Sequence, residues 1–175
     1  MSVTIRPAQP ADARGIARVH VESWRTTYRE ALPKEFLQNL SIDEREQHWS
    51  RHLLNPRPGS FIIIAVDENE HVVGFSSGGN ERSGENVYDG EIYALYLLQE
   101  YQRMGIGRKL VEASIEQMIA QGMTSMLIWV LRENPSRLFY ETMGGVPVDE
   151  KTITIGGVDM VDVAYGWREL GGGRA

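Results

Sequence analysis

Apolar residues recur at intervals that divide the first third of the chain into one strand and two helices. Residues 3–5 form a short apolar segment that predicts a first strand. Pro10–Asp12 open a helix whose apolar positions recur at helical spacing, at Ile16, Val19, His20 and Trp24. Pro33 interrupts this pattern, and a capping-box pattern at Ser41–Glu44 then predicts a second, more polar helix over 41–54.

The middle of the chain is dominated by strand-like segments. Two apolar segments, 61–66 and 72–76, are separated by the turn-forming residues 67–71, which is the pattern of a β-hairpin. A polar, glycine-rich loop then leads to another apolar segment at 91–98. This part of the chain therefore predicts three consecutive strands.

The rest of the chain alternates between helical and strand-like patterns. A helix is predicted over 105–121, a strand over 125–131 and a short helix over 135–143, followed by strands over 151–155 and 158–167. The full order is β-α-α-β-β-β-α-β-α-β-β. This order predicts an α+β fold, in which helices pack on a mixed, mostly antiparallel sheet.

Composition narrows the class of protein. The 175 residues predict one domain over 1–170 with a flexible tail at 171–175. The absence of cysteine excludes disulfides, thiolate metal sites and a cysteine nucleophile. A net charge of −6 argues against nucleic-acid binding. No apolar segment has the length of a membrane span, and the first residues lack the apolar core of a signal peptide, so a soluble cytoplasmic protein is expected.

Residues 90–110 carry the clearest chemical signal. A predicted strand leads through a loop with two glycines, Gly105 and Gly107, directly into a helix. Glycines let a ligand approach the backbone, and the free N–H groups and dipole of a helix N-terminus attract anions. Cationic side chains are supplied nearby by Arg103, Arg108 and Lys109. The segment therefore suits a pyrophosphate, although the same glycines also suit an ordinary tight turn.

Other motifs in the sequence are weaker. No Gly-Lys-Ser/Thr follows the loop, which excludes a Walker A site, and Leu110 occupies the position of the third glycine in a dinucleotide fingerprint. Residues 74–78 match G-x-S-x-G, but all four histidines precede Ser76, whereas a hydrolase of this kind needs a later histidine. His48 and His52 have metal-compatible spacing without the glutamate of H-E-x-x-H, so no metal site is expected.

Two segments together resemble the GNAT superfamily of acyl-CoA-dependent N-acyltransferases. Gln102, Gly105 and Gly107 match the pattern Gln/Arg-x-x-Gly-x-Gly/Ala of the family's motif A. Residues 133–144 resemble motif B, Asn-x-x-(Ala/Arg)-x-Phe-Tyr-Glu-x-x-Gly-Phe, with Gly145 in place of the final aromatic residue. The order of elements agrees over residues 1–170. The resemblance implies a three-layer fold in which two central parallel strands splay apart between flanking helices.

The resemblance also implies a cofactor site, with acetyl-CoA as co-substrate and no metal. The strand before the glycine loop would pair with the pantetheine amides, the loop would cradle the pyrophosphate, and motif B would approach the cofactor from the other side. The implied cofactor-binding residues are Leu95, Tyr96, Leu97, Gln102, Arg103, Met104, Gly105, Ile106, Gly107, Arg108, Asn134 and Tyr140.

Two residues are candidates for catalysis. Tyr140 matches the family tyrosine that protonates the departing thiolate. Glu91 lies where some family members carry a glutamate that acts as general base, and period-two alternation places it on the same strand face as Leu95 and Leu97. Glu91 could equally be a solvated residue at a strand start. The resemblance further implies that Trp24, Tyr28 and Trp49 line the acceptor pocket, and core packing is an alternative for Trp24.

The sequence therefore favours an N-acetyltransferase that moves acetyl from acetyl-CoA to a primary amine of a small molecule or peptide by direct attack. A net negative charge favours a cationic amine. The alternatives are a non-catalytic acyl-CoA-binding sensor module and, more remotely, a dinucleotide-binding oxidoreductase. The family resemblance is compatible with a homodimer, and neither nucleic acid nor a membrane is expected as a partner.

Overall fold

A computed structural model describes residues 2–85 and 87–171. Within these residues one sheet contains seven strands in the order β1-β2-β3-β4-β5-β7-β6. The strands are β1 (Thr4–Pro7), β2 (Phe61–Val66), β3 (Val72–Asn80), β4 (Gly90–Leu97), β5 (Met126–Leu131), β6 (Val146–Ile155) and β7 (Val158–Trp167). The helices are α1 (Ala13–Thr27), α2 (Lys34–Gln38), α3 (Ile42–Leu54), α4 (Ile106–Ala120) and α5 (Ser136–Thr142).

The predicted order of elements is confirmed, with differences where the hydrophobic pattern is weak. The short helix α2 follows Pro33 and was not predicted, because five residues carry too little periodicity. β6 starts at Val146 rather than at residue 151, because most of this edge strand is exposed and lacks an alternating apolar pattern. Of the predicted tail, residues 172–175 lie outside the described residues.

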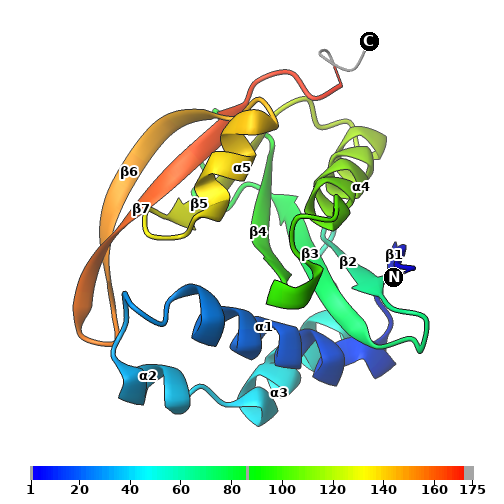
Figure 1. Cartoon of the computed structure of the whole chain (residues 1–175). Helices are drawn as coiled ribbons and strands as arrows, with labels where there is room; N and C mark the ends of the chain where they lie inside the picture. Colours follow the sequence, from blue (N-terminus) through cyan, green and yellow to red (C-terminus); the bar gives the residue numbers. More distant parts are fainter. Residues whose placement is uncertain (1, 86, 172–175) are drawn as a thin grey trace.

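Helices cover both faces of the sheet, as Figure 1 shows. α1 and α3 pack on one face, where Phe75 contacts the rings of His20 and Trp49. α4 lies on the other face. Gly74, the neighbour of Phe75 in β3, points toward that face, and a Cβ placed on it would lie 3.4 Å from Leu110 of α4. The result is the predicted three-layer α+β fold, with the main core between the sheet and these helices. No helix in the described part of the chain is long and apolar enough to cross a membrane.

The two central parallel strands separate after a short paired section. β4 pairs with β5 only from Gly90 to Ile92, opposite Met126 to Ile128. Beyond these positions β4 remains paired with β3, and β5 remains paired with β7 along its whole length. The facing edges of 93–97 and 129–131 therefore have no strand partner in the sheet. This is the predicted splay.

A β-bulge in β4 changes which side chains share a face. Ser77 pairs with Ala94 and Gly78 with Ile92, so Tyr93 is an extra residue in β4. Because one inserted residue reverses the alternation, Leu97 lies on the α4 face, whereas Glu91 lies on the α1 face. The expectation that Glu91, Leu95 and Leu97 share one face was wrong. Local alternation cannot reveal an insertion that depends on pairing with β3.

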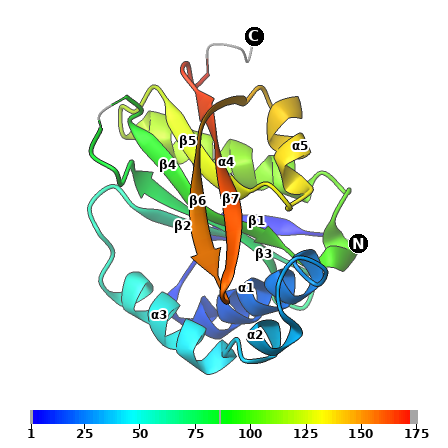
Figure 2. The same cartoon turned by 90° about the vertical axis from the view of Figure 1, so that its left-hand side faces the viewer.

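β6 and β7 form a long antiparallel ribbon that reaches from α5 to the first helices, as Figure 2 shows. The turn at the end of this ribbon lies against α2. The contact is close, since a Cβ placed on Gly156 would lie within 2.9 Å of the ring of Phe36. On the face toward α1, Met160 of β7 is buried with Tyr28 and Leu32. The ribbon therefore closes one side of the space beside the splayed strands.

Candidate active site

A cavity of about 490 Å³ occupies the gap between the splayed strands. Its walls come from the C-terminal half of α1, the unpaired end of β4, the loop before α4, and the start of α5. The residues that line it are Ser23, Thr27, Leu95, Tyr96, Leu97, Gln102, Arg103, Gly105, Gly107, Arg108, Asn134, Pro135, Ser136 and Phe139. Sequence-distant segments therefore meet at one site.

The glycine loop has the backbone geometry that the sequence predicted. Gly105 is the N-cap of α4 and has a φ of +82°, a conformation that favours glycine. Gly107 follows in the first helical turn, where backbone N–H groups lack intrahelical acceptors. The side-chain amide of Gln102 donates to the carbonyl of Leu97 over 3.1 Å, which ties the loop to β4. The loop thus presents free N–H groups and the positive end of α4 to the cavity.

Most of the predicted cofactor-binding residues border this cavity. Leu95, Tyr96, Leu97, Gln102, Arg103, Gly105, Gly107, Arg108 and Asn134 all line it. Three predicted residues do not. Met104 is exposed, the side chain of Ile106 is buried in the core, and Tyr140 is buried beside the cavity.

Tyr140 belongs to α5 and is 3% exposed. Its ring packs against Phe139, Tyr165 and Trp167. Burial raises the pKa of Tyr140 well above its ordinary value, and the neighbouring Tyr96 hydroxyl raises it further. The phenol therefore keeps its proton at neutral pH and faces the part of the site where Tyr96 lies.

Glu91 is buried and forms hydrogen bonds with Arg82. It is 2% exposed, and its carboxylate accepts hydrogen bonds from the backbone N–H of Arg82 at 3.1 Å and from the Arg82 guanidinium at 2.6 Å. The same guanidinium lies over the ring of Tyr93, 4.4 Å from its centroid. The Glu91 side chain is therefore held by Arg82 on the α1 face. The sequence did not indicate this partner, because Arg82 lies in the glycine-rich loop nine residues earlier.

An aromatic wall of Trp24, Tyr28, His20 and Tyr96 lies behind the cavity on the α1 side; Tyr96 lines the cavity, whereas Trp24 and Tyr28, which were expected to line the acceptor pocket, do not border it. Trp24 donates from Nε1 to the Tyr96 hydroxyl over 3.0 Å, and Tyr28 lies next to Trp24, with a ring-centroid separation of 4.8 Å. His20 stacks on Tyr96 at 5.0 Å. Burial lowers the pKa of His20 to about 3, with Arg45 and His48 as further causes. Trp49 does not line the cavity either, because its ring packs on Phe75 in the core.

Two further polar residues near the cavity had no signal in the sequence. Ser23 is 3% exposed and lines the cavity. Asp162 on β7 lies opposite Leu131 of β5, and burial raises its pKa, with Glu91 as a further raising cause. The hydrophobic patterns of α1 and β7 predict only which residues pack in the core. The position of Ser23 and Asp162 near the separated ends of β4 and β5 therefore depends on tertiary structure.

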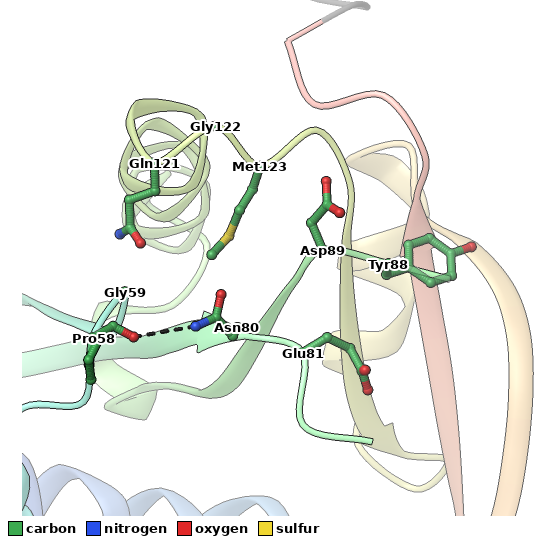
Figure 3. Close-up of a pocket in the computed structure, with 9 residues that line it drawn as sticks. All are labelled: Pro58, Gly59, Asn80, Glu81, Tyr88, Asp89, Gln121, Gly122 and Met123. Carbon is green, nitrogen blue, oxygen red and sulfur yellow. Dashed lines mark hydrogen bonds between the residues drawn. The ribbon is translucent and has the colours of Figure 1, made fainter. Parts of the chain in front are cut away.

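A larger hollow of about 630 Å³ lies at the opposite end of β4, as Figure 3 shows. Two of its polar side chains, Asn80 and Asp89, are already paired. Asn80 donates to the carbonyl of Pro58, and Asp89 accepts from the backbone and the hydroxyl of Thr124. The strand pair is closed at this end, so this hollow does not communicate with the splay. In the described residues, no group of three or more His, Asp or Glu side chains could hold a metal ion.

Comparison with known proteins identifies the fold and its chemistry. The family model described as Acetyltransferase (GNAT) family matches residues 20–144, most of the chain, including the glycine loop and Asn134. The chain belongs to the GNAT acetyltransferase family. It is 42% identical over 168 residues to an uncharacterized N-acetyltransferase of Bacillus subtilis, YuaI, which covers 96% of this chain and 94% of that relative.

Solved GNAT structures have the same fold. PaiA N-acetyltransferase of Thermoplasma acidophilum, in complex with coenzyme A, superposes with a TM-score of 0.69 at 21% identity, over 95% of this chain and 100% of that one. YncA of Salmonella typhimurium, solved with acetyl-CoA, gives 0.69 at 20% identity, over 96% and 94%. The protein is therefore an acetyl-CoA-dependent acyltransferase. Family membership favours this activity over the sensor and oxidoreductase alternatives.

The residues of the cavity fit such a donor. The first turn of α4 and the left-handed Gly105 leave space and free N–H groups for phosphates, with Arg103 and Arg108 at the same wall. The unpaired edge of β4 can accept an added extended chain. Both features were predicted from the sequence.

Proposed function

We propose that this GNAT enzyme transfers acetyl from acetyl-CoA to a primary amine of a small molecule or peptide by direct attack. One observation carries the proposal: a single cavity joins the glycine loop to the unpaired end of β4, including Tyr96, and to Ser23 and Thr27 of α1. Direct attack is supported by the lack of an activated nucleophile. The chain has no cysteine, and no histidine lines the cavity to activate a serine.

Tyr140 is the residue that we assign as general acid. When bound, acetyl-CoA supplies a thioester whose sulfur leaves as a thiolate. The Tyr140 phenol carries a proton at neutral pH, which it can donate to that sulfur, and burial disfavours its ionised form in the free enzyme. The backbone N–H groups at the unpaired end of β4 can stabilise charge on a carbonyl oxygen in the same space.

Glu91 is the residue that we assign as proton acceptor, directly or through water. The bulge at Tyr93 puts it on the α1 face, which also carries Tyr96 and the aromatic wall. Its contact with the Arg82 guanidinium at 2.6 Å holds the carboxylate in place on this face. An incoming ammonium would lose its proton on this face and attack as a neutral amine.

Asp162 supports a cationic acceptor. Two cations face it: Lys151 from β6 and Arg82 from the loop before β4. Both are engaged elsewhere, because Lys151 lies over the ring of Trp129 at 4.2 Å and Arg82 binds Glu91. The Asp162 carboxylate is also one of the causes that raise the pKa of Tyr28 and Tyr96, which belong to the aromatic wall that we assign to the acceptor. A carboxylate left without an ion pair at this place suits an ammonium group.

The test is release of free CoA thiol from acetyl-CoA in the presence of a panel of amines. The protein itself has no cysteine, so a thiol reagent reads only the product. The panel includes a polyamine, an amino sugar, a peptide N-terminus and an uncharged aromatic amine. Amine-dependent release with the cationic members, and a raised KM for them in Asp162→Asn, supports the proposal. Tight CoA binding without release by any amine would favour the non-catalytic acyl-CoA-binding module instead.

A further inference from the structure

The hydroxyl of Ser23 is an anomaly in the described structure. Within residues 2–85 and 87–171, it is the one buried side-chain polar atom that lacks a hydrogen-bonding partner. Buried polar groups are nearly always paired, because leaving one unpaired costs its full desolvation. A buried, unpaired hydroxyl in the middle of α1 therefore needs an explanation.

The helix itself could have satisfied this hydroxyl. A serine within a helix can donate to the carbonyl four residues earlier. Ser114 in α4 does so, with Leu110 as acceptor at 2.8 Å, and it also shares a hydrogen bond with Ser76 at 2.7 Å. Thr26 in α1 likewise donates to the carbonyl of Glu22. Ser23 makes no such bond, although it is buried like Ser114.

The position of Ser23 indicates what its hydroxyl is for. Ser23 borders the cavity together with Thr27, which lies one helical turn later on the same face of α1. The same cavity is bordered by the unpaired residues 95–97 of β4 and by Asn134. Ser23 thus borders the space that an extended donor molecule must enter to reach β4, with its hydroxyl just beneath the cavity surface.

We propose that Ser23 is a hydrogen-bonding residue for the pantetheine arm of CoA, and that its partner arrives only with the donor. The arm carries amide and hydroxyl groups, and a serine hydroxyl can both donate to and accept from such groups. The contact adds a side chain from α1 to the main-chain pairing offered by β4. The proposal rests on acetyl-CoA as donor and is independent of which amine accepts the acetyl group.

The experiment compares Ser23→Ala with Ser114→Ala. Both replace a buried helical serine, so both gain the same helix propensity from alanine. They differ in that only the Ser114 hydroxyl is satisfied within the protein. Thermal unfolding of each ligand-free protein measures stability. Calorimetry then measures binding of CoA, acetyl-CoA and 3′-phospho-ADP, which keeps the nucleotide and its phosphates but lacks the arm.

The expected result is opposite effects in the two assays. Ser23→Ala should raise the Tm of the ligand-free protein, because an unpaired buried hydroxyl is removed, whereas Ser114→Ala should lower it. Ser23→Ala should also weaken CoA and acetyl-CoA equally, by about 3- to 10-fold, the worth of one neutral hydrogen bond, and leave 3′-phospho-ADP unchanged. Ser114→Ala should leave all three affinities unchanged.

Other outcomes overturn the proposal. A lower ligand-free Tm in Ser23→Ala would show that the hydroxyl has a partner within the protein. Unchanged CoA affinity would show that the arm does not use it. Weaker binding of acetyl-CoA alone would assign the contact to the acetyl group, and equal weakening of 3′-phospho-ADP would show an indirect effect on the glycine loop. None of these readings needs an acceptor amine, so failure of the amine panel would not be confused with failure here.

Discussion

The side-chain amide of Asn134 donates a hydrogen bond to the hydroxyl of Tyr28 over 3.1 Å. This contact joins the loop after β5 to the residue that ends α1. The amide oxygen of Asn134 also accepts from the backbone N–H of Ser136 at 2.9 Å, in the first turn of α5. One side chain therefore fixes the start of α5 and the end of α1 on two walls of the cavity.

Asn134→Ala should lower the free energy of unfolding by about 1–3 kcal/mol, because it removes the acceptor for Ser136 and leaves the buried Tyr28 hydroxyl unpaired. Tyr28→Phe removes only the second contact and should cost about 0.5–1.5 kcal/mol. Urea unfolding of both variants measures the difference. Equal losses would mean that the contact with Ser136 contributes nothing to stability.

Gly107→Val should weaken CoA binding strongly and leave the protein folded. A Cβ at this position would lie 3.6 Å from Phe139, which is an ordinary contact, so the protein itself tolerates the side chain. The branched side chain would instead occupy the space expected for the pyrophosphate. Gln117→Val, at an exposed position of the same helix, controls for the lower helix propensity of valine. Unchanged CoA affinity in folded Gly107→Val would contradict the assignment of the loop.

Tyr140→Phe should lower turnover by about 10²- to 10⁴-fold with little change in CoA affinity, because only the proton donor is lost. Tyr165→Phe is the matched control. Tyr165 is a buried tyrosine too, but its hydroxyl donates to Glu141 and does not serve the reaction. Steady-state kinetics under conditions where chemistry limits the rate would compare the two. Equal turnover in wild type and Tyr140→Phe would leave Tyr140 a packing residue.

Glu91→Gln should abolish the rise of activity with pH, since an amide cannot take up the proton of the ammonium. Glu81→Gln changes a carboxylate in the neighbouring loop, where it accepts from the backbone of Ser83 and Gly84, and should keep the wild-type profile. The measurement is kcat/KM as a function of pH for each variant. If Glu91→Gln lowers the Tm but retains the rising limb, Glu91 serves only as the partner of Arg82.

His20 should make the protein less stable in acid. Its pKa is lowered by burial to about 3, whereas an unfolded histidine titrates near 6.5, so the unfolded state binds more protons between these values. Stability from neutral His20 is complete above pH 6.5 and falls as the pH drops toward 3, by up to about 1.4 kcal/mol per pH unit.

The check on His20 is urea unfolding of wild type and His20→Gln at pH 7 and pH 5. Glutamine keeps an acceptor for Trp49, which donates to His20 over 3.3 Å, but cannot be protonated. The variant should therefore lose about 1–2 kcal/mol less than wild type between the two pH values. His48 and His52, whose pKa values are also lowered mainly by burial, titrate in both proteins and cancel in the comparison. Identical losses would show that His20 is not the acid-sensitive group.

Much of the donor site was readable from the sequence because its signals are local. Gly105 has a left-handed φ and α4 begins directly after it, so a short motif determines the backbone geometry that we assign to phosphate binding. The position of Asn134 before α5 is fixed by the same kind of local contact, its bond to the N–H of Ser136. The hydrophobic periods of β2, β3 and α4 likewise gave the order of the elements.

The remaining features depend on which strands pair and how. The single extra residue at Tyr93 exists only because of the register between β3 and β4, and it moves Glu91 and Leu97 to opposite faces. Arg82 meets Glu91 where the loop after β3 folds over the paired end of β4, and Ser23 lies beside the gap because α1 packs there. Sequence determined the local backbone and the order of elements, because both depend on neighbouring residues. Tertiary structure decided which side chains face one another across the cavity, because that depends on strand register and on where a pair of strands separates.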